Sequence, residues 1–198
     1  GVNKPWKWGA SAGNLWRTTM DIRPWWQWMK MIYERNVKLY KYSQKGNWND
    51  PDMLEVGNGS LTPEQNRSHF ALWCMMCSPL ILGNDLRVMK EDVLKIVTNK
   101  KLIAIDQDEL GIPAKRVKKG AADILARPLS GGRWAVCFFN KGGRREVSID
   151  TEKLCADGYV KLERAKAYDC EEVWSGKREK ITTALKAQVE KNDCKVFI

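Results

Sequence analysis

Hydrophobic and polar positions follow two different patterns along this chain of 198 residues. In the first half, short apolar runs typical of strands alternate with longer segments whose apolar residues recur at helical spacing. Residues 14–19 predict a strand that leads into a loop at Asp21. Residues 25–42 predict the helix that follows, with apolar positions at roughly every third or fourth residue: Trp25, Trp28, Met29, Ile32 and Leu39.

A second strand is expected near Trp48, before a helix over residues 63–77. The start of this helix is well marked. Thr62 is the expected N-cap, Pro63 stands at the first helical position, and Gln65 completes a capping box. Because the helix is apolar over much of its surface, we expect it to be packed inside the protein.

A third unit predicts a strand over residues 79–83 and a helix near residues 92–98. Three alternations of strand and helix are typical of βα units that build a parallel sheet. The first half is therefore expected to be an α/β structure.

After residue 111 the pattern changes to short alternating runs separated by turns. The Gly-Gly pairs in residues 130–132 and 141–143 indicate hairpins. Regular spacing of such runs predicts an antiparallel β-sandwich, with a partial (β/α) barrel over residues 1–113 and the sandwich over residues 114–198. The expected strands cover residues 121–129, 133–140, 146–149, 160–168, 171–174, 181–185 and 194–198.

Composition argues against two kinds of partner, nucleic acid and membrane. The net charge is +10, but the basic residues of the second half are scattered and form no dense block. A solvated surface explains them better than a phosphate-binding face, so we expect no nucleic-acid partner. No apolar run approaches the roughly 18 to 20 residues of a membrane span, so no membrane partner is expected.

Six cysteines give no metal-binding pattern. Cys74 and Cys77 have CxxC spacing, but they lie in an apolar helical run without a second pair, which favours buried thiols. One disulfide stays open among the cysteines of the second half, namely Cys137, Cys155, Cys170 and Cys194.

Polar clusters follow each of the three predicted parallel strands. They are Arg17 with Asp21, Asp50 with Asp52, and Asn84 with Asp85. A single aspartate at a strand end is more often a helix cap or turn former. Three in succession favour a shared site, because the carboxyl ends of barrel strands form one face where catalytic groups converge.

Tryptophan is concentrated near the start, with seven of ten within residues 1–48. Trp28 and Trp73 are expected in the core. Four others lie in or beside the loops of the presumed active face, where an indole could either pack or meet the apolar face of a sugar. These are Trp6, Trp8, Trp16 and Trp48.

Residues 16–22, 48–58 and 79–87 resemble successive signatures of the α-galactosidase (melibiase) family, glycoside hydrolase family 27. Residues 104–111 and 127–132 resemble the barrel exit and first sandwich strands of that family. The resemblance implies the C-terminal portion of a (β/α)8 barrel, about its last three βα units, followed by an antiparallel β-sandwich. It also implies hydrolysis of terminal α-D-galactosyl residues with retention of configuration and without a cofactor.

The same resemblance assigns roles to particular residues. Asp21 matches the general acid/base, and Arg17 matches the arginine that contacts both the sugar and the acid/base. Asp52 and Met53 match residues that line the sugar pocket, and Trp16 is an expected substrate contact. Met20 departs from the small or polar residue expected before the acid/base.

The family's nucleophile lies on an earlier barrel strand and has no match in this sequence. We therefore expect the chain alone to have little hydrolase activity, and to self-associate through its open barrel edge or to need the missing half. The resemblance implies α-galactoside substrates and a secreted or periplasmic location. N-acetylgalactosamine and arabinopyranoside specificities stay open, as do a non-catalytic carbohydrate-binding fragment and a nucleic-acid-binding domain. Asn58 begins a formal glycosylation sequon.

Overall fold

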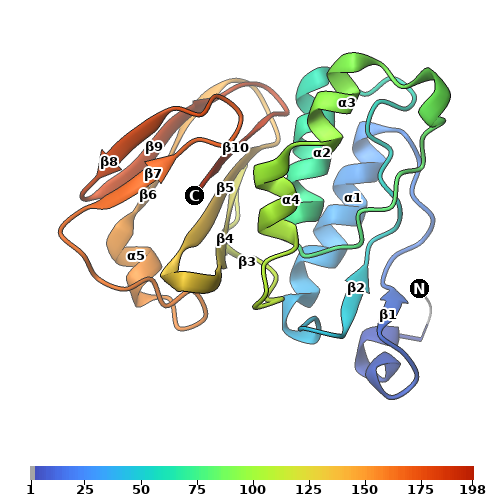
Figure 1. Cartoon of the computed structure of the whole chain (residues 1–198), viewed down its shortest axis with the longest axis horizontal. Helices are drawn as coiled ribbons and strands as arrows, with labels where there is room; N and C mark the ends of the chain where they lie inside the picture. Colours follow the sequence, from blue (N-terminus) through green and yellow to red (C-terminus); the bar gives the residue numbers. More distant parts are fainter. Residues whose placement is uncertain (1–2) are drawn as a thin grey trace.

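The first half of the chain folds as short parallel strands covered by helices (Figure 1). The computed structural model describes residues 3–198. Strand β1 (Leu15–Arg17) pairs in parallel with β2 (Trp48–Asp50), with Leu15 opposite Trp48 and Arg17 opposite Asp50. The helices are α1 (Trp26–Asn36), α2 (Pro63–Met75), α3 (Glu91–Val97) and α4 (Lys100–Asp106), and 3₁₀ helices span Pro5–Lys7, Gly9–Ser11, Val37–Tyr42 and Leu86–Val88.

The third strand is shorter than the sequence predicts. Within residues 79–83 only Leu82 forms a parallel bridge, and its partner is Leu54. The Leu54 N–H donates to the Ile81 carbonyl at 2.7 Å, and the Gly83 N–H donates to the Leu54 carbonyl at 2.9 Å. The segment is extended, but its backbone hydrogen bonds to a neighbouring strand are limited to those with Leu54. The prediction of a strand over all of residues 79–83 was therefore wrong.

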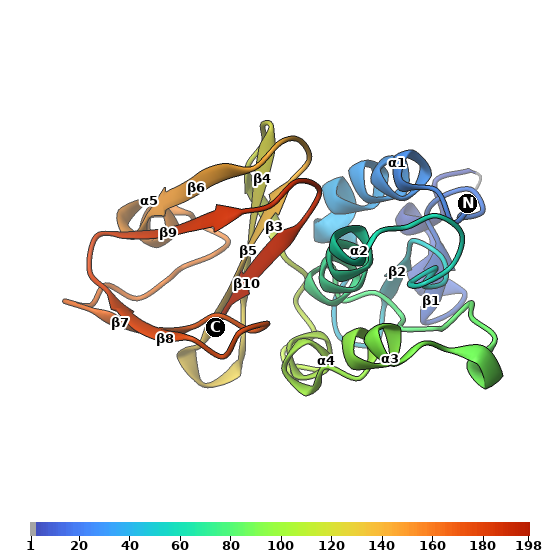
Figure 2. The same cartoon turned by 90° about the horizontal axis from the view of Figure 1, so that it is seen from above.

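Helix α2 begins as its sequence predicts. The Gln65 N–H donates to Thr62 Oγ1 at 3.4 Å, and the Thr62 N–H donates to Gln65 Oε1 at 3.0 Å, which is a complete capping box. The helix is buried along most of its length, including Phe70, Leu72 and Trp73. It contacts α1, α3 and α4 on one side and strands β5 and β10 on the other, so it is the central element of the molecule (Figure 2).

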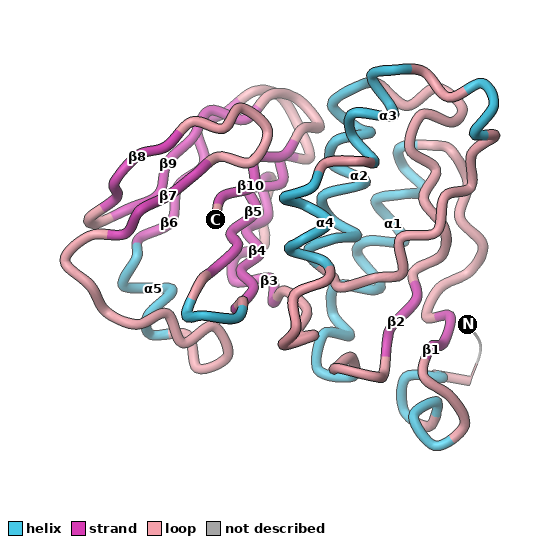
Figure 3. Tube along the Cα trace, viewed as in Figure 1, coloured by secondary structure: helices cyan, strands magenta, loops and turns pink. Residues whose placement is uncertain are grey.

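The second half forms the expected antiparallel sandwich. Strands β10, β5, β4 and β3 make a four-stranded sheet in that order, and the β6–β9 and β7–β8 ribbons lie across from it (Figure 2). A short helix α5 (Thr151–Ala156) follows β6 (Figure 3). The strands are β3 (Lys115–Lys118), β4 (Ala122–Pro128), β5 (Trp134–Asn140), β6 (Arg145–Asp150), β7 (Tyr168–Glu171), β8 (Arg178–Ile181), β9 (Ala184–Val189) and β10 (Cys194–Phe197).

Four sandwich predictions were wrong in detail. The Gly-Gly pair in residues 141–143 joins β5 to β6, which lie in different sheets, so it forms no hairpin. Residues 171–174 are not one strand, because β7 ends at Glu171 and a turn follows. Residues 161–167 form no strand, because the Asp157 carboxylate accepts the Tyr159 and Val160 N–H groups in a turn and Lys161 has a φ of 51°. Residues 181–185 span the turn between β8 and β9, so they are not one strand.

Buried polar contacts join the two halves. Arg127 on β4 is fully buried, and it donates to the Cys74 carbonyl at 2.6 Å and the Asp106 carbonyl at 3.1 Å. Arg116 on β3 pairs with Glu34 of α1 at 2.8 Å. Such contacts fix the sandwich against the helices. Helix α4 ends at Asp106 and β3 begins at Lys115, on either side of the division proposed at residue 113.

The cysteines are unpaired in the structure. All six lie within the described residues and none forms a disulfide, which answers the question left open by the sequence. Cys74 and Cys77 are buried, as predicted. Among residues 3–198, no helix has the length and apolar character that crossing a membrane requires.

Candidate active site

The parallel pairing of β1 and β2 brings two of the three predicted polar clusters together. Arg17 ends β1 directly opposite Asp50, which ends β2. The chain leaves both strands at the same edge and continues to Asp21 on one side and Asp52 on the other. This is the arrangement expected at the carboxyl edge of a barrel sheet.

Arg17 connects the two carboxylates. Its Nη2 atom lies 2.6 Å from Asp52 Oδ2 and 3.2 Å from Asp21 Oδ1. Because both oxygens contact the same nitrogen, they lie within about 6 Å of one another. The pair therefore has to be weighed as an acid/base and a nucleophile, whose carboxyl groups lie roughly 5 Å apart in a retaining glycosidase.

Asp52 is nevertheless fully engaged in holding the loop. Its side chain is 8% exposed. Besides the ion pair with Arg17, Oδ2 accepts the Ile22 N–H at 2.7 Å and Oδ1 accepts the Met53 N–H at 2.8 Å. Its φ is 92°, a conformation that L-residues rarely adopt. A carboxylate with both oxygens bonded in a strained turn fixes geometry and is poorly placed to attack a sugar.

Asp21 is in the opposite situation. Its side chain is 95% exposed and has one ion pair, to Arg17. Its main chain is fixed, because Trp28 Nε1 donates to the Asp21 carbonyl at 2.7 Å. The main chain of Asp21 is thus fixed while its carboxyl group is exposed, with Oδ1 in contact with Arg17, which suits a group that exchanges protons with a ligand.

Asp50 stabilises the turn at Asp52. It is buried, and its Oδ1 accepts the Asp52 N–H at 2.8 Å. Burial raises the pKa of Asp50, and the Asp52 N–H and the Arg17 charge offset part of that effect. Its role is to hold the Asp52 turn.

Trp16 is largely covered by other residues in this structure, and its role as a substrate contact stays a prediction. The residue is 6% exposed, and its Nε1 donates to Asn49 Oδ1 at 2.8 Å. Gly9 packs so closely that a Cβ there would lie 2.5 Å from the indole. The 3₁₀ segments before β1 cover this side chain, which alternation along the strand does not reveal.

The other expected site residues differ in their exposure. Met53 is 42% exposed and follows Asp52 directly, so its place in the sugar pocket stays a prediction. Trp8 is exposed, whereas Trp6 and Trp48 are half-buried. Trp73 is fully buried as predicted, but Trp28 is only partly buried at the edge of the core.

The third polar cluster is engaged locally. Asn84 donates to Asn58 Oδ1 at 3.1 Å, and Asp85 pairs with Arg87 at 2.6 Å. Asn58 in turn donates to Glu55 Oε2 at 2.6 Å and to the Gly83 carbonyl at 3.1 Å. Both amide hydrogens of Asn58 are occupied, so its structural role is to tie two loops together.

Two residues of α2 support the site and were not predicted to do so. Trp73 Nε1 donates to the Asp52 carbonyl at 2.8 Å, and His69 Nε2 accepts the Glu55 N–H at 2.9 Å. Burial lowers the pKa of His69 to about 3, so the ring is a neutral acceptor. The sequence feature that indicates these supporting roles is a histidine and a tryptophan four residues apart, on one face of the helix.

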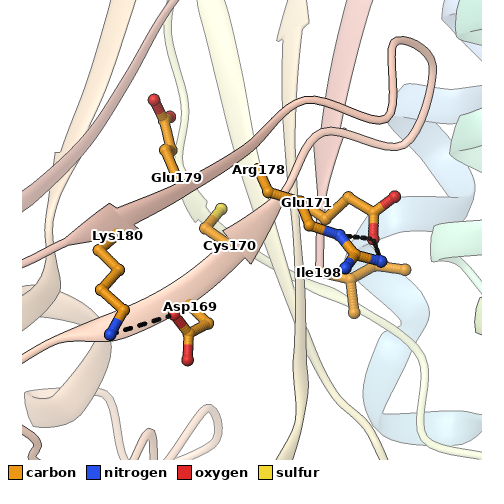
Figure 4. Close-up of a pocket in the computed structure, with 7 residues that line it drawn as sticks. All are labelled: Asp169, Cys170, Glu171, Arg178, Glu179, Lys180 and Ile198. Carbon is orange, nitrogen blue, oxygen red and sulfur yellow. Dashed lines mark hydrogen bonds and ion pairs between the residues drawn. The ribbon is translucent and has the colours of Figure 1, made fainter.

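The sandwich has its own concavity, of about 590 Å³, between β7, β8 and the end of the chain (Figure 4). Four of its charged side chains pair with each other, and Glu179 pairs with Lys177 at 3.7 Å. Arg178 contacts Glu171 at 3.2 Å, and Lys180 contacts Asp169 at 3.9 Å. Within the described residues, no group of three or more His, Cys, Asp or Glu side chains is arranged to hold a metal ion. The Arg17 cluster is therefore the stronger candidate for chemistry.

Both halves of the chain match known protein families. The α-galactosidase A family model matches residues 6–108, and the α-galactosidase C-terminal β-sandwich model matches residues 119–198. Alpha-galactosidase 2 of Arabidopsis thaliana is 38% identical over 100% of the chain and 49% of its own length. Alpha-galactosidase A of Cellvibrio japonicus is 40% identical over 89% of the chain and 48% of its own length.

The fold has close relatives among solved structures. A Bacteroides fragilis protein assigned as an α-galactosidase/melibiase superposes with a TM-score of 0.88 at 37% identity, covering 98% of the chain and 44% of that protein. The chain spans about half the length of the curated relatives it matches. The expected fold, part of a barrel followed by a β-sandwich, is confirmed. The chain belongs to the α-galactosidase (melibiase) family, glycoside hydrolase family 27.

Proposed function

We propose that this chain supplies the acid/base side of a retaining α-galactoside-hydrolysing centre, with Asp21 as the acid/base. One observation carries the proposal. Arg17 joins an exposed Asp21 to a buried Asp52 at the carboxyl edge of parallel strands. That edge is where barrel enzymes place their catalytic groups.

Each residue then has a role that follows from its surroundings. Asp21 donates a proton to the glycosidic oxygen as the leaving group departs, and later takes a proton from water. Arg17 orients the Asp21 carboxyl and faces the sugar, where its charge and hydrogen bonds position the substrate. Asp52 fixes Arg17 and the chain that follows Asp21, and Met53 lines the sugar pocket.

A retaining mechanism needs a second, free carboxylate about 5 Å from the first. Both oxygens of Asp52 are occupied, and Asp50 is buried beneath it. Neither is suited to attack the anomeric carbon. We therefore place the nucleophile on a barrel strand other than β1 and β2, so that the chain by itself hydrolyses little or no substrate.

The test uses the purified chain, alone and mixed with the portion of the Cellvibrio relative that precedes the matched region. The substrates are 4-nitrophenyl α-D-galactoside and melibiose. The chain alone should release no product, and the mixture should hydrolyse both. Turnover by the chain alone that is lost in Asp21→Asn would overturn the placement of the nucleophile.

The two substrates separate the acid/base from other roles. A nitrophenolate leaves without protonation, whereas the sugar of melibiose needs a proton. Asp21→Asn should therefore slow melibiose hydrolysis by roughly 10²- to 10⁴-fold and slow departure of the aryl group much less. Because Asp21 also acts as the base toward water, overall turnover of both substrates should fall, and kcat/KM is compared because it reports the departure step. Equal losses of kcat/KM for both substrates would contradict the assignment.

A second candidate function is carbohydrate binding without hydrolysis. It is favoured by the Arg17 cluster, in which Asp21 is exposed and Asp52 is buried with both oxygens bonded. Binding of galactose by the chain, with no hydrolysis in any mixture, supports it. Parallel assays with 4-nitrophenyl N-acetyl-α-galactosaminide and 4-nitrophenyl β-L-arabinopyranoside compare the two alternative specificities.

A further inference from the structure

An aromatic cluster lies directly after Asp21 along the chain. The Trp25 and Trp28 rings meet edge to face, with their centroids 6.4 Å apart. The Arg23 guanidinium lies 5.7 Å from the centroid of each ring. Trp25 is 55% exposed, whereas Trp28 packs against the core. The cluster thus offers one exposed indole and one exposed guanidinium beside a partly buried Trp28.

The cluster is tied to Asp21 by the backbone. Trp28 Nε1 donates to the Asp21 carbonyl, so the inner ring of the cluster holds the main chain of the proposed acid/base. The intervening turn is stiff. The Trp25 N–H bonds to the Arg23 carbonyl at 2.7 Å, and Gly59 packs so closely under Pro24 that a Cβ there would lie 2.5 Å from the Pro24 carbonyl oxygen.

Packing against its neighbours leaves Trp25 more than half exposed. Its apolar surface faces water, and no other described ring covers it apart from the edge contact with Trp28. A rigid indole in water beside a catalytic group is a ready-made surface for a flat, partly apolar ligand. Arg23 adds hydrogen-bond donors in a fixed plane that match hydroxyl oxygens.

We propose that Trp25 and Arg23 form the subsite for the leaving group, and that this group is a neutral sugar bonded through the galactosyl unit. The inference rests on the proposed function of Asp21. An acid/base protonates the oxygen that joins the two sugars, so the leaving group must lie on the Asp21 side of the site. Trp25 receives the apolar face of that sugar, and Arg23 donates to its hydroxyl oxygens.

Binding to the full chain tests this proposal without requiring hydrolysis. Affinities for galactose and for melibiose are measured by NMR titration for the wild type, Trp25→Ala, Trp25→Phe and Tyr42→Ala. Tyr42 is the matched control because it is an aromatic residue, 42% exposed, in the segment that leads into the start of β2. Circular dichroism checks that each variant is folded.

The wild type should bind melibiose more tightly than galactose, by roughly fivefold for one stacked ring. Trp25→Ala should remove this preference and leave galactose binding unchanged, Trp25→Phe should keep part of it, and Tyr42→Ala should keep all of it. Equal affinities in the wild type, a preference that survives Trp25→Ala, or no saccharide binding would overturn the subsite. The preference could instead depend on Trp25 while mixtures of the chain with the preceding portion of the Cellvibrio relative never hydrolyse substrate. That result would overturn the proposed function and retain the saccharide subsite at Trp25.

Discussion

At the residue scale, the two aspartates that share Arg17 have different tasks. Asp52 is buried with both oxygens bonded, and Asp21 is exposed with one ion pair. The difference is one of surroundings, since the side chains are identical. Replacing Asp52 by asparagine should therefore lower the stability of the fold. The same substitution at Asp21 should lower activity and leave stability unchanged.

Asp52→Asn should destabilise the fold by about 3 kcal/mol, because it leaves Arg17 without its buried partner. Asp21→Asn should leave the denaturation midpoint unchanged, since the side chain is exposed. Urea unfolding of both variants measures the difference. Equal midpoints for the two variants would mean that Asp52 does not hold the loop.

His69 should make stability depend on pH. Burial lowers its pKa in the folded state to about 3, from 6.5 for an unburied histidine. Between these values the unfolded chain binds a proton that the folded chain does not, so stability falls as pH falls, by about 1.4 kcal/mol per unit. Urea unfolding at pH 7, 5 and 4 should show a smaller pH dependence for His69→Gln than for the wild type; identical slopes would contradict this.

The Arg17, Asp21 and Asp52 cluster could be predicted from sequence, because parallel strands bring their carboxyl ends to one edge. The burial of Trp16 could not. Strand alternation does not show whether the preceding segment folds back over the indole, and the close approach of Gly9 is a tertiary contact. The supporting roles of His69 and Trp73 depend likewise on how α2 packs under the loop.

At the element scale, the start of α2 is fixed by local chemistry. Thr62→Ala removes the hydroxyl that accepts the Gln65 N–H, and should lower the free energy of unfolding by about 1 kcal/mol. Thr182→Ala, at an exposed position in the turn after β8, is the matched control and should have little effect. Thermal unfolding compares the two variants, and an unchanged midpoint for Thr62→Ala would show that packing alone sets this helix.

Elements with local signals were predicted well, and those set by distant contacts were not. The capping box and the Gly-Gly turn of residues 130–132, which joins the paired strands β4 and β5, act within a few residues. Helix α4 was missed although Asn99 caps it, since its Oδ1 accepts the Lys101 and Leu102 N–H groups at 3.1 Å. The alternation in residues 160–168 resembled a strand, but the left-handed Lys161 breaks it.

At the scale of the whole molecule, a buried charge cluster joins α1 to the sandwich. Asp123 is fully buried and accepts from Arg116 Nη1 at 2.9 Å, Lys141 Nζ at 2.8 Å and Tyr33 Oη at 2.9 Å. Glu34 of α1 pairs with the same Arg116 and Lys141. Burial raises the pKa of Asp123, but the bonds from Lys141, the Gly120 N–H and Arg116 outweigh it and hold the pKa below its usual value.

Asp123→Asn should destabilise the protein by about 3 kcal/mol, because two cations stay buried with one carboxylate between them. Because the folded pKa of Asp123 is depressed, its contribution is present above the unfolded pKa near 4 and is lost as pH falls through the folded value. Calorimetry at pH 7 measures the loss and shows whether the two halves still unfold together. Asp169→Asn, with a side chain 88% exposed, is the control, and an equally small effect of both substitutions would contradict the role of the cluster.

The central claim concerns Asp21, and one measurement tests it most directly. Melibiose hydrolysis is followed for the chain mixed with the preceding portion of the Cellvibrio relative, with wild-type Asp21 and with Asp21→Asn. We expect hydrolysis by the wild-type mixture and a loss of at least about 10²-fold in the variant. Hydrolysis of melibiose at the same rate by both mixtures would contradict the assignment of Asp21 as the acid/base.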